Sequence, residues 1–392
     1  MPGFAALRAT PEFAALIAAS AALGRDPLQV QAAGGNTSLK AQGAMWVKAS
    51  GFWLAEAEKR DVFLPVDVAG LRAALQTGRP FDAMAYVPTE ANPNGLRPSI
   101  ETTLHAALDW PVVLHTHCVA TIALAVRADV EALLAERLDG LDAVFVPYAM
   151  PGPSLARAIL ERAIPPQTRL APAIPTGARA RVVVLGNHGL VVGGPDVVTA
   201  VALLREVSRR LAGAPAEAER WPDHPPAGLA EAMPGTLTET VAGTRAETVA
   251  EALAGALAGS GWRPVDHAPT HAMARDPRRL ALVARGSLYP DHVIFLGPGV
   301  AVAAPGERPD ATMARTGGQA RLLLLPGLGA ALPADASPAQ IAMARCLGDV
   351  AMRIAPDAAL TVLSPEDEAA LLDWDAEKYR QALEAARQEG GA

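Results

Sequence analysis

The stretch PVVLHTHCVAT, residues 111–121, carries the strongest pattern in this 392-residue chain. An apolar run after Pro111 leads into two histidines, which is typical of a buried strand. Because side chains alternate between the faces of a strand, His115 and His117 share one face and Thr116 points to the other. Two imidazoles so placed can converge on one metal ion. A hydrogen-bonded structural pair is the alternative, and the strand alone leaves both open.

A third histidine lies in RVVVLGNHGLVVGG, residues 181–194, between two apolar runs. The residues Asn187, His188 and Gly189 predict a tight turn or bulge, with His188 at a strand end. Three histidines with no cysteine ligand leave an open coordination position, which is typical of catalytic metal sites. A turn histidine without a chemical role is the competing interpretation.

Alternating helical and strand periodicities predict an α/β domain over residues 1–212. Helices are expected over 12–24, 131–138, 154–164 and 197–213, and strands over 44–50, 112–117, 143–147 and 181–194. Prolines and absent periodicity over 213–235 indicate a linker.

Residues 236–392 predict a smaller α/β domain, and the chain as a whole shows no internal repeat in its sequence. Helices are expected over 247–258 and 338–355, and strands over 279–286, 291–297 and 321–327. From a capping box at Ser364 and Asp367, the tail is expected to be a helix packed through Leu371, Leu372, Trp374 and Tyr379.

Charge and composition narrow the class of protein. The formal net charge of -7 and the absence of a run of Lys or Arg argue against nucleic acid as a partner. Two cysteines outside any CxxC pattern predict a reducing compartment. No apolar run reaches the ~18 residues of a membrane span. We therefore expect a soluble cytoplasmic protein without a membrane partner.

An acidic candidate residue lies before the histidine strand, in GLRPSIETTLHAAL, residues 95–108. Pro98 and Ser99 are expected to open a helix and to place Glu101 in its first turn. An acid at that position also complements the helix dipole, without any chemical role.

The stretch AAGGNTSLKAQGAMWVKASGFWL, residues 32–54, contains two glycine turns with hydroxyls and lysines nearby. Successive backbone amides in such turns can hold a phosphate. The stretch lacks the GKS/T of a P-loop and the GxGxxG of a dinucleotide site. Two ordinary glycine turns are the alternative.

Six motifs in this order, GGNTS, KASG, PSIE, HTH, VPYAMPG and NHGL, resemble the class II aldolase/adducin superfamily. The resemblance covers residues 12 to 210. It implies an α/β fold whose aldolase-like domain has three layers, α/β/α, followed here by a smaller C-terminal α/β domain.

The resemblance also implies roles for individual residues. His115, His117 and His188 would bind zinc, and Glu101 would be the acid/base. Tyr148 matches a tyrosine that protonates the aldehyde oxygen, usually across a subunit interface. The substrate phosphate would be held by Gly35, Asn36, Ser50, Gly51 and Ser99. The family often has a second serine where this chain has Ile100, and Lys48 is expected to compensate.

The segment SLYPDHVIFLGPG, residues 287–299, and the acidic tail resemble the part that follows the aldolase motifs in bifunctional rhamnulose phosphate aldolase/dehydrogenases. No TGxxxGxG pattern follows, so we expect no dehydrogenase domain in this sequence.

The resemblance implies a zinc-dependent cleavage of a ketose 1-phosphate to dihydroxyacetone phosphate and an aldehyde. Decarboxylation or epimerisation of a sugar or sugar-acid phosphate is the alternative with the same metal. A non-enzymatic adducin-like interaction module is a second alternative, against which the complete set of three histidines and Glu101 argues. By analogy with the family, the protein is expected to form a homo-oligomer, a tetramer.

Overall fold

The computed structural model describes residues 3–163, 180–212 and 242–374. Its N-terminal part contains a seven-stranded mixed sheet in the order β3-β2-β1-β4-β7-β6-β5. The strands are β1 (Asn36–Ala41), β2 (Ala44–Lys48), β3 (Phe63–Asp67), β4 (Val112–Thr116), β5 (Ala143–Val146), β6 (Val182–Leu185) and β7 (Gly189–Gly194). All neighbouring pairs are antiparallel except β5 and β6.

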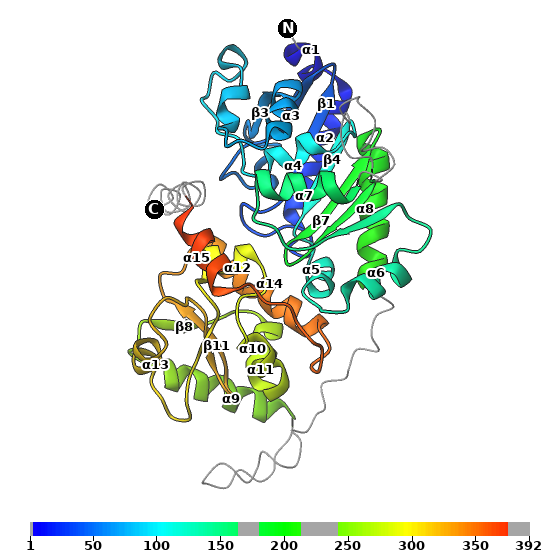
Figure 1. The fold of residues 1–392 in the computed structure, drawn as a ribbon. Helices are drawn as coiled ribbons and strands as arrows, with labels where there is room; N and C mark the ends of the chain where they lie inside the picture. Colours follow the sequence, from blue (N-terminus) through cyan, green and yellow to red (C-terminus); the bar gives the residue numbers. More distant parts are fainter. Residues whose placement is uncertain (1–2, 164–179, 213–241, 375–392) are drawn as a thin grey trace.

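Helices cover both faces of this sheet (Figure 1). They are α1 (Phe4–Arg8), α2 (Pro11–Arg25), α3 (Val68–Thr77), α4 (Thr102–Ala107), α5 (Val119–Ala125), α6 (Val130–Arg137), α7 (Pro153–Ala163) and α8 (Val197–Ala212). Single 3-10 turns lie at Leu54–Glu56, Ala83–Tyr86 and Thr89–Ala91. This is the expected three-layer α/β/α arrangement.

Successive side chains of the central strand β4 point to opposite faces of the sheet, so each face packs against its own layer of helices. Val112 and Leu114 pack with α2 and α8 on one face, whereas Val113 packs with α4 and α7 on the other. His115 has the same parity as Val113, so it points to the face that carries α4. His115 therefore lies on the face of the sheet that carries α4, and Glu101 directly precedes this helix.

The C-terminal part contains a four-stranded sheet in the order β8-β11-β10-β9. Its strands are β8 (Trp262–Pro264), β9 (Ala301–Val302), β10 (Leu323–Leu325) and β11 (Gly329–Pro333). Its helices are α9 (Ala242–Leu257), α10 (Ala268–Arg275), α11 (Pro277–Val283), α12 (Pro290–Leu296), α13 (Pro309–Arg315), α14 (Pro338–Arg353) and α15 (Pro365–Asp373).

This second sheet repeats the connectivity of the β4-β7-β6-β5 half of the first sheet. In both, the first and fourth strands in sequence pair antiparallel, the third and fourth form a hairpin, and the second and third pair parallel. A helix follows the hairpin in both cases, α8 in one and α14 in the other. The sequence shows no internal repeat, so this likeness is one of strand connectivity alone.

The two parts share an apolar core around α5. Val119, Ile122 and Val126 belong to the same buried cluster as Leu288 and Met343 of the C-terminal part. Figure 1 shows α5 at the lower edge of the N-terminal part, above α14.

Two of the expected strands are helices. Residues 279–286 fall largely in α11, and residues 291–297 fall in α12. A short apolar run does not by itself distinguish a buried strand from a buried helix. Pro277 and Pro290 hold the first position of these helices, which was the available signal for a helix start.

Three other expected elements of the C-terminal part form, over 247–258, 321–327 and 338–355, whereas β8, β9, β11, α10 and α13 were not expected. The expected tail helix ends at Asp373, so Trp374 lies outside it. Both β10 and α14 form where they were predicted, and the capping box of Ser364 and Asp367 starts α15. Leu371 is buried, and the Trp374 ring lies against Gly152. The expected linker 213–235 and Tyr379 lie outside the described residues.

Candidate metal centre

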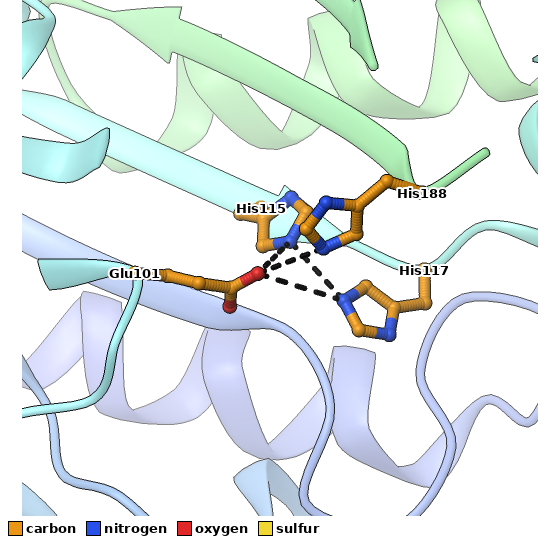
Figure 2. Close-up of side chains that lie close together, drawn as sticks. All are labelled: Glu101, His115, His117 and His188. Atoms are coloured by element: carbon orange, nitrogen blue, oxygen red, sulfur yellow. Dashed lines mark hydrogen bonds and ion pairs between the residues drawn. The ribbon is translucent and has the colours of Figure 1, made fainter. Parts of the chain in front are cut away.

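Four buried side chains from three segments converge on one point (Figure 2). His115 lies in β4, His117 follows the end of that strand, and His188 lies in the turn between β6 and β7. The fourth residue, Glu101, comes just before α4. One ligand atom from each of the four lies within 4.8 Å of the others.

The imidazoles are arranged symmetrically. Their ring centroids are 5.0, 5.0 and 5.1 Å apart. Glu101 Oε1 lies 3.1 Å from His115 Nε2, 2.8 Å from His188 Nε2 and 4.0 Å from His117 Nε2. All three Nε2 atoms therefore face the same space, which the carboxylate closes on one side.

The outer ring nitrogens fix two of the tautomers. His115 Nδ1 lies 3.0 Å from the carbonyl oxygen of Leu190, and His117 Nδ1 lies 2.8 Å from Asp291 Oδ2. Because a carbonyl and an ionised carboxylate only accept hydrogen bonds, each Nδ1 carries the proton and donates it. In neutral rings the two Nε2 atoms then present lone pairs.

Those two lone pairs face each other, with His115 Nε2 and His117 Nε2 separated by 3.2 Å. Such a contact is repulsive unless a proton or a cation lies between the nitrogens. A tetrahedral zinc ion about 2.0 to 2.1 Å from each nitrogen separates two ligand nitrogens by about 3.3 Å. The donor set and its spacing therefore fit a divalent metal ion.

Opposing effects act on the ionisation of this cluster. Burial alone would raise the pKa of Glu101, but the facing imidazoles of His115 and His188 outweigh it and hold that pKa well below its usual value. Burial lowers the pKa of His188, and Glu101 offsets only part of that effect. Burial also lowers the pKa of His115, but the charge of Glu101 and its hydrogen bond outweigh burial, so the pKa of His115 is raised.

The start of α4 differs from the sequence expectation. The helix begins at Thr102, so Glu101 occupies the N-cap position rather than the first turn, and its side chain makes no capping hydrogen bond. Instead Oε2 accepts a hydrogen bond of 2.5 Å from Asn36 Nδ2. The carboxylate is thus turned toward the histidines, and a role at the helix N-terminus alone does not account for its contacts.

The predicted phosphate residues lie in three neighbouring segments next to this cluster, at Gly35 and Asn36, at Ser50 and Gly51, and at Ser99. Asn36 Nδ2 is also 3.4 Å from Ser99 Oγ, which in turn accepts from the amide of Glu101. The Ser50 amide donates to the Arg97 carbonyl, which brings the turn at Gly51 beside residues 97–99. Gly51 has a positive φ of 74°, and Gly35 one of 66°, both of which favour glycine.

Lys48 is buried and forms hydrogen bonds with the backbone of the loop that contains Gly35. Its Nζ donates to the carbonyl oxygens of Ala33 and Gly35, at 2.8 and 3.0 Å. Compensation by Lys48 for the hydroxyl that Ile100 replaces stays a prediction.

Tyr148 lies beside the turn that carries His188, with its backbone against Gly186. Its half-buried ring packs against the C-terminal apolar cluster, and its hydroxyl donates to Met150 Sδ at 4.0 Å. Burial, and then the Asp367 charge, raise the pKa of the Tyr148 phenol well above its usual value. Within the described ranges, no hydrogen bond joins it to the four clustered side chains.

Sequence reasoning missed Asp291, which contacts His117 from the C-terminal part. The run that contains it was assigned to a strand, where nothing placed the carboxylate near the histidines. Its signal was an acid inside an otherwise apolar run directly after Pro290.

Within the described ranges, no helix is both long and apolar enough to cross a membrane.

Comparisons with known proteins identify the family of the N-terminal part. Residues 14–212 match the family described as the Class II Aldolase and Adducin N-terminal domain. The protein named uncharacterized oxidoreductase YuxG from Bacillus subtilis is 32% identical over 198 residues, which are 46% of this chain and 26% of that protein. The match thus spans about a quarter of the length of that curated relative.

Solved structures of similar proteins cover the same share of the chain. The N-terminal class II aldolase domain of a Thermoplasma acidophilum protein is 26% identical and covers 50% of this chain and 90% of its own, with a TM-score of 0.40. The l-fuculose-1-phosphate aldolase from Thermus thermophilus is 16% identical and covers 51% and 90%, with a TM-score of 0.32. Because the family match alone spans half of the sequence, the chain belongs to the class II aldolase and adducin family.

Proposed function

We propose that this protein is a zinc-dependent lyase that cleaves a ketose 1-phosphate to dihydroxyacetone phosphate and an aldehyde. The observation that carries the proposal is the convergence of three buried Nε2 atoms and the Glu101 carboxylate. Three histidine ligands leave a coordination position for substrate, as catalytic zinc sites do.

His115, His117 and His188 would hold the ion. When bound, it supplies a Lewis acid that polarises a substrate carbonyl. The protein's own contribution is to keep the Nε2 atoms of His115 and His117 deprotonated and directed at the ion, through the Nδ1 contacts of these two residues.

Glu101 would move the proton at carbon. Its lowered pKa keeps it ionised at rest, and Asn36 orients it. In the direction of carbon–carbon bond formation the carboxylate removes a proton from the three-carbon fragment. In the direction of cleavage the same group returns that proton to the carbon that loses its partner.

Tyr148 would handle the second proton, which belongs to the hydroxyl that becomes the aldehyde oxygen. A phenol with a raised pKa stays protonated and suits donation to that oxygen in the synthetic direction. Gly35, Asn36, Ser50, Gly51 and Ser99 would bind the phosphate, which the adjacency of their three segments supports.

The proposal extends to the other properties expected from the sequence. The protein would act on small sugar phosphates in the cytoplasm, as a homo-oligomer. Both cysteines, Cys118 and Cys346, are buried and free, which agrees with a reducing compartment.

The test compares the wild type with Glu101→Gln. The variant is expected to retain the metal and to lose turnover by about 10²- to 10⁴-fold, the usual contribution of general acid–base catalysis. Zinc content is measured by elemental analysis, and cleavage of rhamnulose 1-phosphate and fuculose 1-phosphate by the dihydroxyacetone phosphate released. Glu90→Gln, an exposed carboxylate in a 3-10 turn, is the matched control.

A wild-type protein that carries zinc but releases no aldehyde from either ketose phosphate contradicts aldol cleavage. Carbon dioxide or an epimeric sugar among the products would point to the decarboxylase or epimerase alternative. A protein that binds no divalent ion would instead favour the adducin-like alternative.

A further inference from the structure

Asp291 connects the C-terminal part of the chain to the metal centre. It lies in the first turn of α12, it is only 5% exposed, and its Oδ2 accepts a hydrogen bond of 2.8 Å from His117 Nδ1. The two residues are 174 positions apart in sequence. A buried carboxylate of the second sheet region is thus in direct contact with a histidine of the first.

Gly34 makes room for this contact. A Cβ atom added to Gly34 would lie 2.7 Å from His117 Nδ1 and 2.9 Å from Asp291 Oδ2. Any side chain at this position would therefore press on both partners of the hydrogen bond. The first glycine of GGNTS serves the junction of the two parts.

The position of α12 is held by apolar packing and by hydrogen bonds. Val293 of α12 shares its buried cluster with Val119 and Ile122 of α5, the helix that starts directly after His117 and Cys118. Asn187 adds polar contacts, because its Nδ2 donates to the carbonyl oxygens of Leu288 and Thr361. The C-terminal part is therefore attached to both of the segments that carry His117 and His188.

The C-terminal sheet has no histidine set of its own at the corresponding positions. When the hairpin residue Gly189 is aligned with Gly329, the strand partners align His115 with Pro264. By the same register His117 corresponds to Asp266 and His188 to Leu328. The repeated half thus lacks the ligands, and its buried carboxylate at Asp291 faces the metal centre of the other half.

We propose that Asp291 is a positioning residue of the metal centre, supplied by the C-terminal part of the chain. Its carboxylate holds the proton on His117 Nδ1, fixes the orientation of the ring and leaves Nε2 as a basic lone pair directed at the metal. Carboxylates that orient a metal-binding histidine in this way tune metal affinity. The inference rests on the proposed metal site but not on the identity of the reaction.

The test measures zinc affinity for Asp291→Asn and Asp291→Ala in the full-length protein, by competition with a chromophoric chelator. Both variants are expected to bind zinc about 10- to 100-fold more weakly than the wild type. Asp291→Asn keeps the shape of the side chain and removes only the charge, so it serves where the alanine variant fails to fold. Asp310→Asn, an exposed carboxylate of α13, is the control and should bind zinc as the wild type does.

The visible spectrum of the cobalt-substituted protein separates positioning from packing. If Asp291 orients His117, the spectrum of Asp291→Asn shifts while the thermal midpoint of the metal-free protein stays near that of the wild type. Unchanged zinc affinity and an unchanged cobalt spectrum in Asp291→Asn overturn the inference. A wild type that binds zinc tightly but cleaves no ketose phosphate overturns the proposed reaction alone, and the affinity test still decides the role of Asp291.

Discussion

The space beside Gly34 is too narrow for a Cβ atom. An added Cβ would also lie 2.9 Å from the carbonyl oxygen of Gln31, so the backbone on the other side leaves no room for a shift. We expect Gly34→Ala to lower the free energy of unfolding by about 1 to 3 kcal/mol, as overpacking does, and to weaken zinc binding because His117 and Asp291 are pushed apart.

Urea unfolding and chelator competition check this prediction. Gly255→Ala is the control, since a Cβ at this exposed helical glycine meets nothing within 4 Å. It should leave stability equal or raise it by about 0.5 to 1 kcal/mol. A Gly34→Ala protein as stable as the wild type would show that the loop yields more easily than the distances indicate.

At this scale the sequence predicted the histidines well and their partners poorly. Period-2 alternation places His115 and His117 on one face whatever surrounds them, and Gly189 beside His188 marks the turn. For Glu101 the sequence placed the residue in the first turn of α4, whereas it is the N-cap, and its contacts with Asn36 and the imidazoles are tertiary ones that no local pattern encodes. An acid in an apolar run marks Asp291 as unusual, but its partner could not be predicted, since the contact depends on how two distant parts of the chain pack.

Helix α12 also contains a buried histidine, His292, whose protonation is expected to destabilise the fold. His292 is fully buried; its Nδ1 accepts from the Leu288 amide and its Nε2 donates to the Gly299 carbonyl. The Tyr289 ring lies 5.8 Å away, and Asp291 precedes it in the helix. Burial lowers the pKa of His292 to about 4, although the hydrogen bond to Gly299 acts in the opposite direction.

A histidine whose folded pKa lies below its unfolded value stabilises the fold above the unfolded pKa of about 6.5. As the pH falls from 6.5 to 4, the unfolded chain binds a proton that the folded chain refuses. We expect His292 to contribute a loss of stability on the order of 3 kcal/mol over this range.

Unfolding measured between pH 4 and pH 7.5 for the wild type and His292→Gln tests this contribution. The comparison is needed because burial also lowers the pKa of His105 and acts in the same direction. The variant should show the smaller loss on acidification. Parallel pH profiles for the two proteins would contradict the assignment to His292.

Among the elements, those with long periodic patterns were predicted and the short ones were not. Helices α2, α8 and α14 repeat their apolar residues over several turns, so their sequences suffice. Both α11 and α12 have seven residues, too few for a period to be counted. The edge strand β8, with three residues, has no sequence pattern that could have been recognised.

On the scale of the whole molecule, metal binding and stability are expected to be coupled. The Nε2 atoms of the three histidines face one another only when β4, the β6–β7 turn and α12 are all in place. A ligand that binds only the folded protein stabilises it by about 4 kcal/mol at a thousand times its dissociation constant.

Removing the metal with a chelator should therefore lower the thermal midpoint, and adding zinc back should restore it. Calorimetry of the chelator-treated and zinc-reloaded protein measures the change. Asp291→Asn should show a smaller difference between the two states than Asp310→Asn. A midpoint that does not respond to the chelator in the wild type would count against the metal centre.

The contact between Asp291 and His117 forms late in synthesis, because Asp291 is added to the chain after all three histidines. A ribosome that has just added His188 must add 291 − 188 = 103 further residues before Asp291 exists, which at about 5 to 20 residues per second takes about 5 to 20 s. Throughout that interval the nascent chain carries all three histidines but lacks the carboxylate that orients one of them. If Asp291 orients His117 as proposed, the nascent chain binds the ion about 10- to 100-fold more weakly until synthesis has passed α12.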